Sequence, residues 1–230
     1  MSNPFKFRYV PLAAFCVAAL AAAQPTLAGG FRAVGARRTV GGYATGHVRA
    51  ARGPEGRQGY RAGNTQHFDD GSVTHESRAG YSGPNLTAQS DRSTTRAADG
   101  TVSHQAERSV TGANGGSYSG QRSYTHNPDG SAQASFQRNG QGAAGGSFQS
   151  SGSATRNADG TFSSSRQATA SGARGSYAGD TTRGNGTITH DSTIVGANGN
   201  SYQGQTTYTK GQGITHSGSC KDAQGNPIQC

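Results

Sequence analysis

The chain of 230 residues contains no tryptophan, one methionine and few bulky apolar residues. Leucine, isoleucine, valine and phenylalanine together make up only about a tenth of it, below the ~20% under which a chain with high net charge tends to be disordered. This shortage excludes an α/β enzyme with a thick hydrophobic core. Charged residues make up 14% of the chain, which excludes a coiled coil or a densely charged tail. The remaining classes are a disordered chain and a repetitive β-structure that needs little core per strand.

Acidic residues are also scarce, with 12 against 21 lysines and arginines, and the formal net charge is +9. The only glutamates are Glu55, Glu76 and Glu107, so paired carboxylates for acid–base chemistry are hard to assemble. The sequence has no HExxH, GxSxG or P-loop spacing. We therefore predict that the protein is not an enzyme and has no catalytic, cofactor-binding or metal-binding residues.

Residues 1–28 have the pattern of a signal peptide. Lys6 and Arg8 precede an apolar, alanine-rich run over 10–23, and Pro25 precedes a small-residue cleavage site at 26–28. Cleavage after Ala23 is the alternative. The run is too short and too rich in alanine to favour a transmembrane helix. We predict an exported protein of the periplasm, the outer surface or the extracellular medium.

Of the three cysteines, Cys16 lies in this leader, which leaves Cys220 and Cys230. In an oxidising compartment we expect these two to pair. The bridge would close the C-terminal tail, residues 220–230, and stabilise it by roughly 2–3 kcal/mol.

Residues 29–66 are rich in arginine, glycine and alanine, contain the single acid Glu55 and show no apolar period. This composition predicts a flexible basic arm. Because guanidinium groups suit bidentate contact with phosphate or carboxylate, the arm is a candidate site for nucleic acid, lipopolysaccharide or acidic polysaccharide, and a solvated linker is the alternative. The candidate contact residues are Arg32, Arg37, Arg38, Arg49, Arg52, Arg57 and Arg61.

From about residue 67 to 219 the chain repeats with a period of about 30 residues. Asp-Gly or Asn-Gly pairs end at Gly71, Gly100, Gly130, Gly160 and Gly186. A second turn signal lies midway, as in GANGGSY at 112–118 and GAAGGSF at 142–148. Each unit therefore holds two segments between two different turns.

Within the segments, apolar and polar residues alternate with period two, which is typical of half-buried strands. Loop lengths predict the partners. A three-residue loop at 128–130 sets Tyr124 opposite Ala134, and a five-residue loop at 112–116 sets Val110 opposite Tyr118. One shorter loop switches the apolar residues from even numbers, as at Ala170, to odd numbers, as at Tyr177, and a later loop switches them back. These loops predict two further pairs, Arg183 with Ile188 and Ile194 with Tyr202.

We therefore predict an all-β fold, a repetitive antiparallel meander of about eleven strands between 72 and 219, preceded by the disordered arm. A β-solenoid is the alternative. The apolar face is thin, so we expect the sheet to curl, to pack its apolar faces together or to gain stability from a partner or from assembly. That face holds Val73, Tyr81, Leu86, Val102, Val110, Tyr118, Tyr124, Phe136, Phe148, Phe162, Tyr177, Ile188, Ile194, Tyr202, Tyr208 and Ile214.

The turns TGANG at 111–115 and VGANG at 195–199, with the Cys220–Cys230 tail, resemble those of uncharacterised bacterial exported proteins made of Gly/Ser/Thr/Arg-rich repeats. The resemblance covers about two-thirds of the chain. It implies no known activity and no site residues.

Histidines recur at one position of the repeat, at His75, His104, His190 and His216. A meander would place equivalent residues two strands apart, about 9–10 Å, too far to share a metal ion, whereas a solenoid could bring some together. We interpret them as polar rings on half-exposed strands.

These observations predict a non-enzymatic exported protein with a structural or adhesive role in the bacterial envelope or extracellular matrix. Its expected partners are further copies of itself or envelope and matrix components. The alternative is a polyanion-binding module that acts through the arginine-rich arm.

Overall fold

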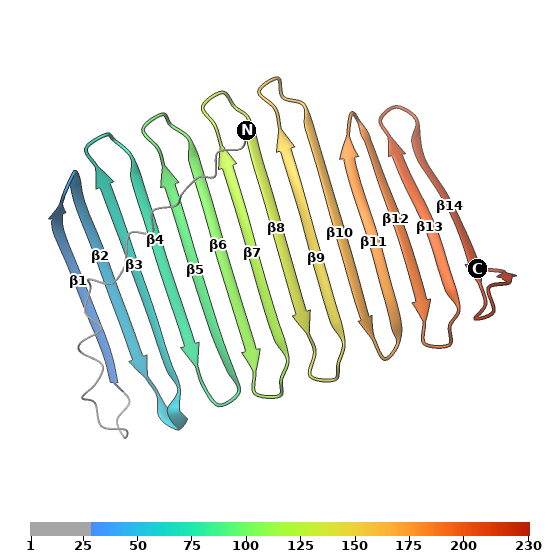
Figure 1. Ribbon diagram of the computed structural model, residues 1–230, viewed down its shortest axis with the longest axis horizontal. Coiled ribbons are helices and arrows are strands. Elements are labelled where there is room, and N and C mark those ends of the chain that lie inside the picture. The colour runs from blue at the N-terminus through green and yellow to red at the C-terminus, as the bar shows by residue number, and fades with distance from the viewer. Residues whose placement is uncertain (1–28) are drawn as a thin grey trace, which may run out of the picture.

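The computed structural model describes residues 29–230, and the predicted signal peptide at 1–28 lies outside the described residues. The chain forms one open antiparallel sheet in which each strand pairs with its neighbours in the sequence (Figure 1). The strands are β1 (Gly29–Thr39), β2 (Gly42–Arg52), β3 (Gln58–Phe68), β4 (Val73–Ser82), β5 (Leu86–Arg96), β6 (Val102–Gly112), β7 (Ser117–His126), β8 (Ala132–Gln141), β9 (Ser147–Arg156), β10 (Phe162–Gly172), β11 (Gly175–Gly184), β12 (Thr187–Gly196), β13 (Ser201–Thr209), β14 (Gly213–Lys221) and β15 (Pro227–Ile228).

The predicted meander is confirmed, and the solenoid alternative is excluded by the strand order. The eleven strands expected between 72 and 219 correspond to β4 to β14. All four predicted pairs are direct partners: Tyr124–Ala134, Val110–Tyr118, Arg183–Ile188 and Ile194–Tyr202. The expected switch in numbering is also present, since Ala170 pairs with Tyr177.

The turn between β7 and β8 illustrates why the loop lengths fix this register. The Asn127 N–H donates to the Ser131 carbonyl (2.9 Å), and the Gly130 N–H donates to the Asn127 carbonyl (3.0 Å). Gly130 has a φ of 84°, a conformation that favours glycine. The Asp129 carboxylate accepts the Ser131 N–H (2.9 Å). The loop therefore ends after three residues, and both strands leave it in register.

Residues 29–66 differ from the prediction of a flexible arm, because they form β1, β2 and most of β3, with a short 3₁₀ turn at Pro54–Gly56. β3 pairs with β4 from Gln58 to His67. The strand pattern is hard to see in the sequence because glycine, alanine and arginine occupy most positions on both faces. An exposed strand edge offers backbone donors and acceptors whatever the side chains are, and β3, β2 and β1 continue the sheet from β4 in this way.

The sheet has almost no hydrophobic core, since Ala44 is the only buried apolar residue among those described. The sixteen apolar residues predicted to share a face do share one, yet the sheet neither curls into a closed form nor packs that face on a second layer. Backbone pairing and cross-strand side-chain contacts therefore hold the fold together.

At the C-terminus, Cys220 and Cys230 form the predicted disulfide, with their Cα atoms 5.2 Å apart. Cys220 and Lys221 pair with Ile228 and Pro227 of β15. The bridge thus folds the tail back against the end of β14.

Candidate functional site

The register divides the strand residues into two faces, because directly paired residues in an antiparallel sheet point to the same side. We call one side the arginine face. It carries twelve arginines: Arg32, Arg38, Arg49, Arg61, Arg92, Arg96, Arg108, Arg122, Arg138, Arg156, Arg166 and Arg183.

The strands place no carboxylate on the arginine face. All their acidic residues lie on the opposite side, which we call the polar face: Glu76, Asp91, Glu107, Asp180 and Asp191. The strand cations of the polar face are Arg37, Arg52, Arg78 and Lys221, and Arg78 forms an ion pair with Asp91. The positive charge of the described sheet is therefore concentrated on one side.

At the centre of the arginine face, guanidinium groups form a stripe that runs across the strands. Arg92 and Arg122 lie in one row, separated by Ala106, and Arg108 and Arg138 lie in the next row, separated by Gly120. These four exposed residues come from the consecutive strands β5 to β8, with one guanidinium group for each inter-strand step of ~4.8 Å. The stripe continues to Arg166 on β10.

A second group of arginines occupies β1 to β3, where Arg32 pairs with Arg49 and Arg49 pairs with Arg61. Like charges directly opposite one another destabilise a sheet. The arrangement therefore has a cost in the free protein that an anionic ligand would relieve.

Aromatic rings flank the central stripe on the same face. Tyr118, Phe148, Tyr177 and Tyr202 lie in one row of direct partners, with small or aliphatic residues between them. Phe148 is 40% exposed. The rings thus offer surface on which a base or a sugar could stack.

Glycines on the arginine face leave space for neighbouring aromatic rings. A Cβ atom at Gly152 would lie 2.7 Å from the Phe136 ring, and one at Gly120 would lie 2.7 Å from the Tyr118 hydroxyl. The rings therefore occupy the space above neighbouring glycines. The Arg138 guanidinium lies 5.2 Å from the centroid of the Phe136 ring, within the range of a cation–π contact.

All seven histidines also lie on the arginine face, and four of them repeat one contact. The Nδ1 atom of each is 2.8–2.9 Å from a threonine hydroxyl on the preceding strand, in the pairs His75–Thr65, His104–Thr94, His190–Thr181 and His216–Thr206. His75 and His104 lie two strands apart, as do His190 and His216. Residues 29–230 contain no cluster of three or more His, Cys, Asp or Glu side chains that could hold a metal ion.

His104 lies next to the central stripe. Burial lowers its pKa, and the charges of Arg122 and Arg92 lower it further. The Arg122 Nη2 atom is 3.5 Å from His104 Nε2. The positive field of the stripe thus acts on a neighbouring titratable group.

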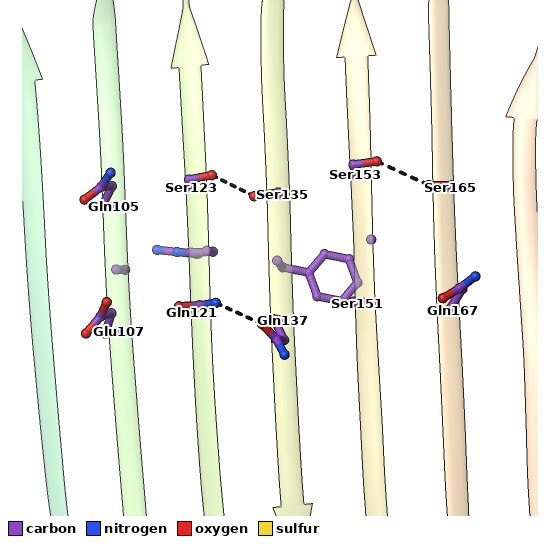
Figure 2. Close-up of a pocket in the computed structure, with 14 residues that line it drawn as sticks. Gln105, Glu107, Gln121, Ser123, Ser135, Gln137, Ser151, Ser153, Ser165 and Gln167 are labelled. Carbon is purple, nitrogen blue, oxygen red and sulfur yellow. Dashed lines mark hydrogen bonds between the residues drawn. The ribbon is translucent and has the colours of Figure 1, made fainter. Parts of the chain in front are cut away.

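The polar face carries mainly serine, threonine and glutamine between β5 and β14. Many of these side chains pair across strands (Figure 2): Ser123 with Ser135 (2.8 Å), Ser153 with Ser165 (3.2 Å), and Gln121 with Gln137 (2.9 Å). These hydroxyl and amide groups therefore hydrogen-bond to one another across the strands.

The seven arginines predicted as polyanion contacts do not all lie on one face of the sheet. Arg32, Arg38, Arg49 and Arg61 lie on the arginine face, whereas Arg37 and Arg52 lie on the polar face. Arg57 follows the 3₁₀ turn and forms an ion pair with Glu55 (2.8 Å). The prediction omitted the eight arginines of the arginine face in β5 to β11. These arginines occupy the same alternate positions of the segments as the predicted apolar residues, and this alternation could have identified their shared face.

Within the part of the chain that the structure describes, no helix has the length and hydrophobicity to cross a membrane. No protein-family model matches the chain, and comparisons with curated proteins and with solved structures likewise find no match.

Proposed function

We propose that the protein is a non-enzymatic, exported scaffold of the envelope or extracellular matrix that adheres to linear anionic polymers through its arginine face. The observation that carries this proposal is the segregation of charge, with twelve strand arginines and no strand carboxylate on one side of a sheet. The proposal therefore assigns polyanion binding to the sheet, whereas the sequence predicted a flexible arm.

The shape of the surface favours a long ligand. The stripe runs perpendicular to the strands and crosses a sheet whose fourteen long strands span roughly 60 Å. An arginine can bind a phosphate or carboxylate group in bidentate fashion, and each contact with a polymer releases counterions. The exposed Phe148 ring and the half-buried tyrosine rings beside the stripe add stacking surface for bases or sugars.

The export component is supported by the leader pattern at 1–28 and by the disulfide at the C-terminus. The structural component is supported by a fold made of repeated hairpins, with both faces open over most of their area.

The test replaces Arg108, Arg122 and Arg138 with glutamine together. We expect the affinity for labelled single-stranded DNA and for a polyuronate to fall at least about tenfold at low salt. The slope of log affinity against log salt should decrease by about 2, because three cationic contacts are lost. Fluorescence anisotropy over a series of salt concentrations measures both quantities.

The matched control replaces Arg52, Arg174 and Lys221 with glutamine. It removes the same charge from the polar face and a turn, so it should bind nearly as the parent protein does. Equal losses in the two variants would indicate net charge alone and would overturn the proposal, as would the absence of salt-dependent binding in the parent. Dextran, a neutral polymer, serves as the ligand control.

A further inference from the structure

Both ends of the sheet present open strand edges. On its outer side, β1 pairs with no other strand among the described residues, and β14 pairs there with β15 only through Cys220 and Lys221. Residues 213–219 of β14 are therefore open, as is the length of β1. Backbone N–H and C=O groups at such edges are templates for pairing with another chain.

The two edges are complementary in direction and register. Successive strands are antiparallel and β1 and β14 are separated by thirteen steps, so the β1 of a copy shifted along the sheet would run antiparallel to β14. One row of direct partners runs from Ala36 to Ile214, so the shifted copy would place its Ala36 opposite Ile214. That row is Ala36, Thr45, Thr65, His75, Thr94, His104, Tyr124, Ala134, Ala154, Ser164, Arg183, Ile188, Tyr208 and Ile214.

The side chains that would meet in this register are compatible. Arg32 would lie opposite Gly218, and Arg37 would lie opposite Gly213, so neither arginine would face another cation. The centre of β1, residues 33–36, contains only alanine, valine and glycine. The junction therefore contains no pair of like charges directly opposite one another, the arrangement that disfavours cross-strand pairing.

The two most exposed large apolar side chains of the strands also lie at the two edges that would form this junction. Val34 is 69% exposed and Ile214 is 72% exposed, more than any other large apolar residue within the described strands. The two lie on the same face at opposite edges of the sheet. In the shifted register they become diagonal neighbours, which is close enough for side-chain contact.

We propose that copies of the protein join edge to edge, with β1 of one copy pairing with residues 213–219 of β14 in the next. The contact is heterologous and leaves an open edge at each end, so it generates a filament rather than a closed oligomer. The arginine faces of successive copies then lie on the same side. The tail closed by Cys220–Cys230 covers the last residues of β14 and limits the junction to seven residue pairs.

A cysteine cross-link tests the junction in the full-length protein. The variant carries Ala36→Cys and Ile214→Cys in a Cys16→Ser background. Thirteen inter-strand steps put these positions roughly 60 Å apart within one chain, whereas a disulfide requires Cα atoms within about 7 Å. Mild oxidation should therefore produce a ladder of covalent oligomers on a non-reducing gel, and reduction should return it to one band.

The matched control carries Ala36→Cys and Thr215→Cys, which places the two thiols on opposite faces and one residue out of register. It should give no ladder. The proposal is overturned if both pairs cross-link equally, if only a dimer forms, or if the parent protein sediments as a monomer at every concentration. Neither cysteine pair replaces an arginine, so the absence of a ladder would not bear on the polyanion proposal. Conversely, a protein that binds no polyanion could still form the ladder.

Discussion

At the scale of single residues, glycine has two separate roles in this sheet. In the turns it supplies positive φ, as at Gly130. Within the strands it leaves space that a neighbouring aromatic ring fills, as Phe136 does above Gly152. A ring that covers a strand glycine shields the glycine backbone from solvent. A sheet without a second layer can form this contact within its own surface.

This role predicts that Gly152→Ala destabilises the fold, although the substitution adds only one methyl group. The new Cβ would lie 2.7 Å from both the Phe136 ring and the Ser165 carbonyl oxygen, and the carbonyl cannot move without disturbing the ladder. We expect a loss of about 1–3 kcal/mol in the free energy of unfolding, measured with urea. Gly184→Ala is the control, because its Cβ would meet only ordinary contacts at 3.8–3.9 Å. Equal losses at both positions would contradict the ring-filling role.

At the scale of strands and turns, the sequence predicts most of the fold because loop length and side-chain alternation give the same register. The shorter loop before Gly175 sets even-numbered Ala170 opposite odd-numbered Tyr177. The two-residue turn at Asn185–Gly186 then sets odd-numbered Arg183 opposite even-numbered Ile188, which restores even numbers to the apolar face. Residues 29–66 escaped prediction for a physical reason. Glycine, alanine and arginine occupy most positions on both faces of these strands, so apolar and polar residues do not alternate, and the backbone edge of β4 positions the strands.

A comparison of two loops in this protein predicts the effect of an insertion in the loop at 128–130. The loop at 172–175 has one residue fewer than the loop at 142–146, yet Ala170 pairs directly with both Phe148 and Tyr177, so the two rings share one face. One extra glycine after Asp129 should likewise lengthen the turn without turning the later strands over. We expect far-UV circular dichroism to stay strand-like and polyanion affinity to stay close to that of the parent protein. A several-fold loss of affinity, expected if the later strands turned over, would contradict this prediction.

At the scale of the whole molecule, the candidate site depends on the complete register. The central stripe joins residues up to about seventy positions apart in the sequence, from Arg92 to Arg166. Composition alone placed the positive charge in the segment 29–66. The charge of the later repeats is nearly balanced in sequence, and only the separation of arginines and carboxylates onto opposite faces makes one side of them basic.

The absence of a shared core also determines how the molecule should respond to losing a repeat. Each strand packs against its neighbours in the sequence, so stability should be close to a sum of nearest-neighbour terms. Removing residues 117–146 deletes β7 and β8 with one full period. Ser147 then takes the place of Ser117, and Phe148 takes the place of Tyr118 opposite Val110. We expect a folded, shorter sheet whose melting temperature changes by about 5 °C or less.

Removing only residues 117–131 is the control, because it joins the turn at 112–116 to Ala132, which faces the arginine side, whereas Ser117 faces the polar side. This mismatch should lower the melting temperature more than the first deletion does, and the first deletion should keep the arginine face and lose only the contributions of Arg122 and Arg138. Circular dichroism melts and anisotropy with single-stranded DNA separate the two outcomes. If removing 117–146 unfolded the protein, distant strands would have to stabilise one another, and the one-dimensional account of this sheet would be wrong.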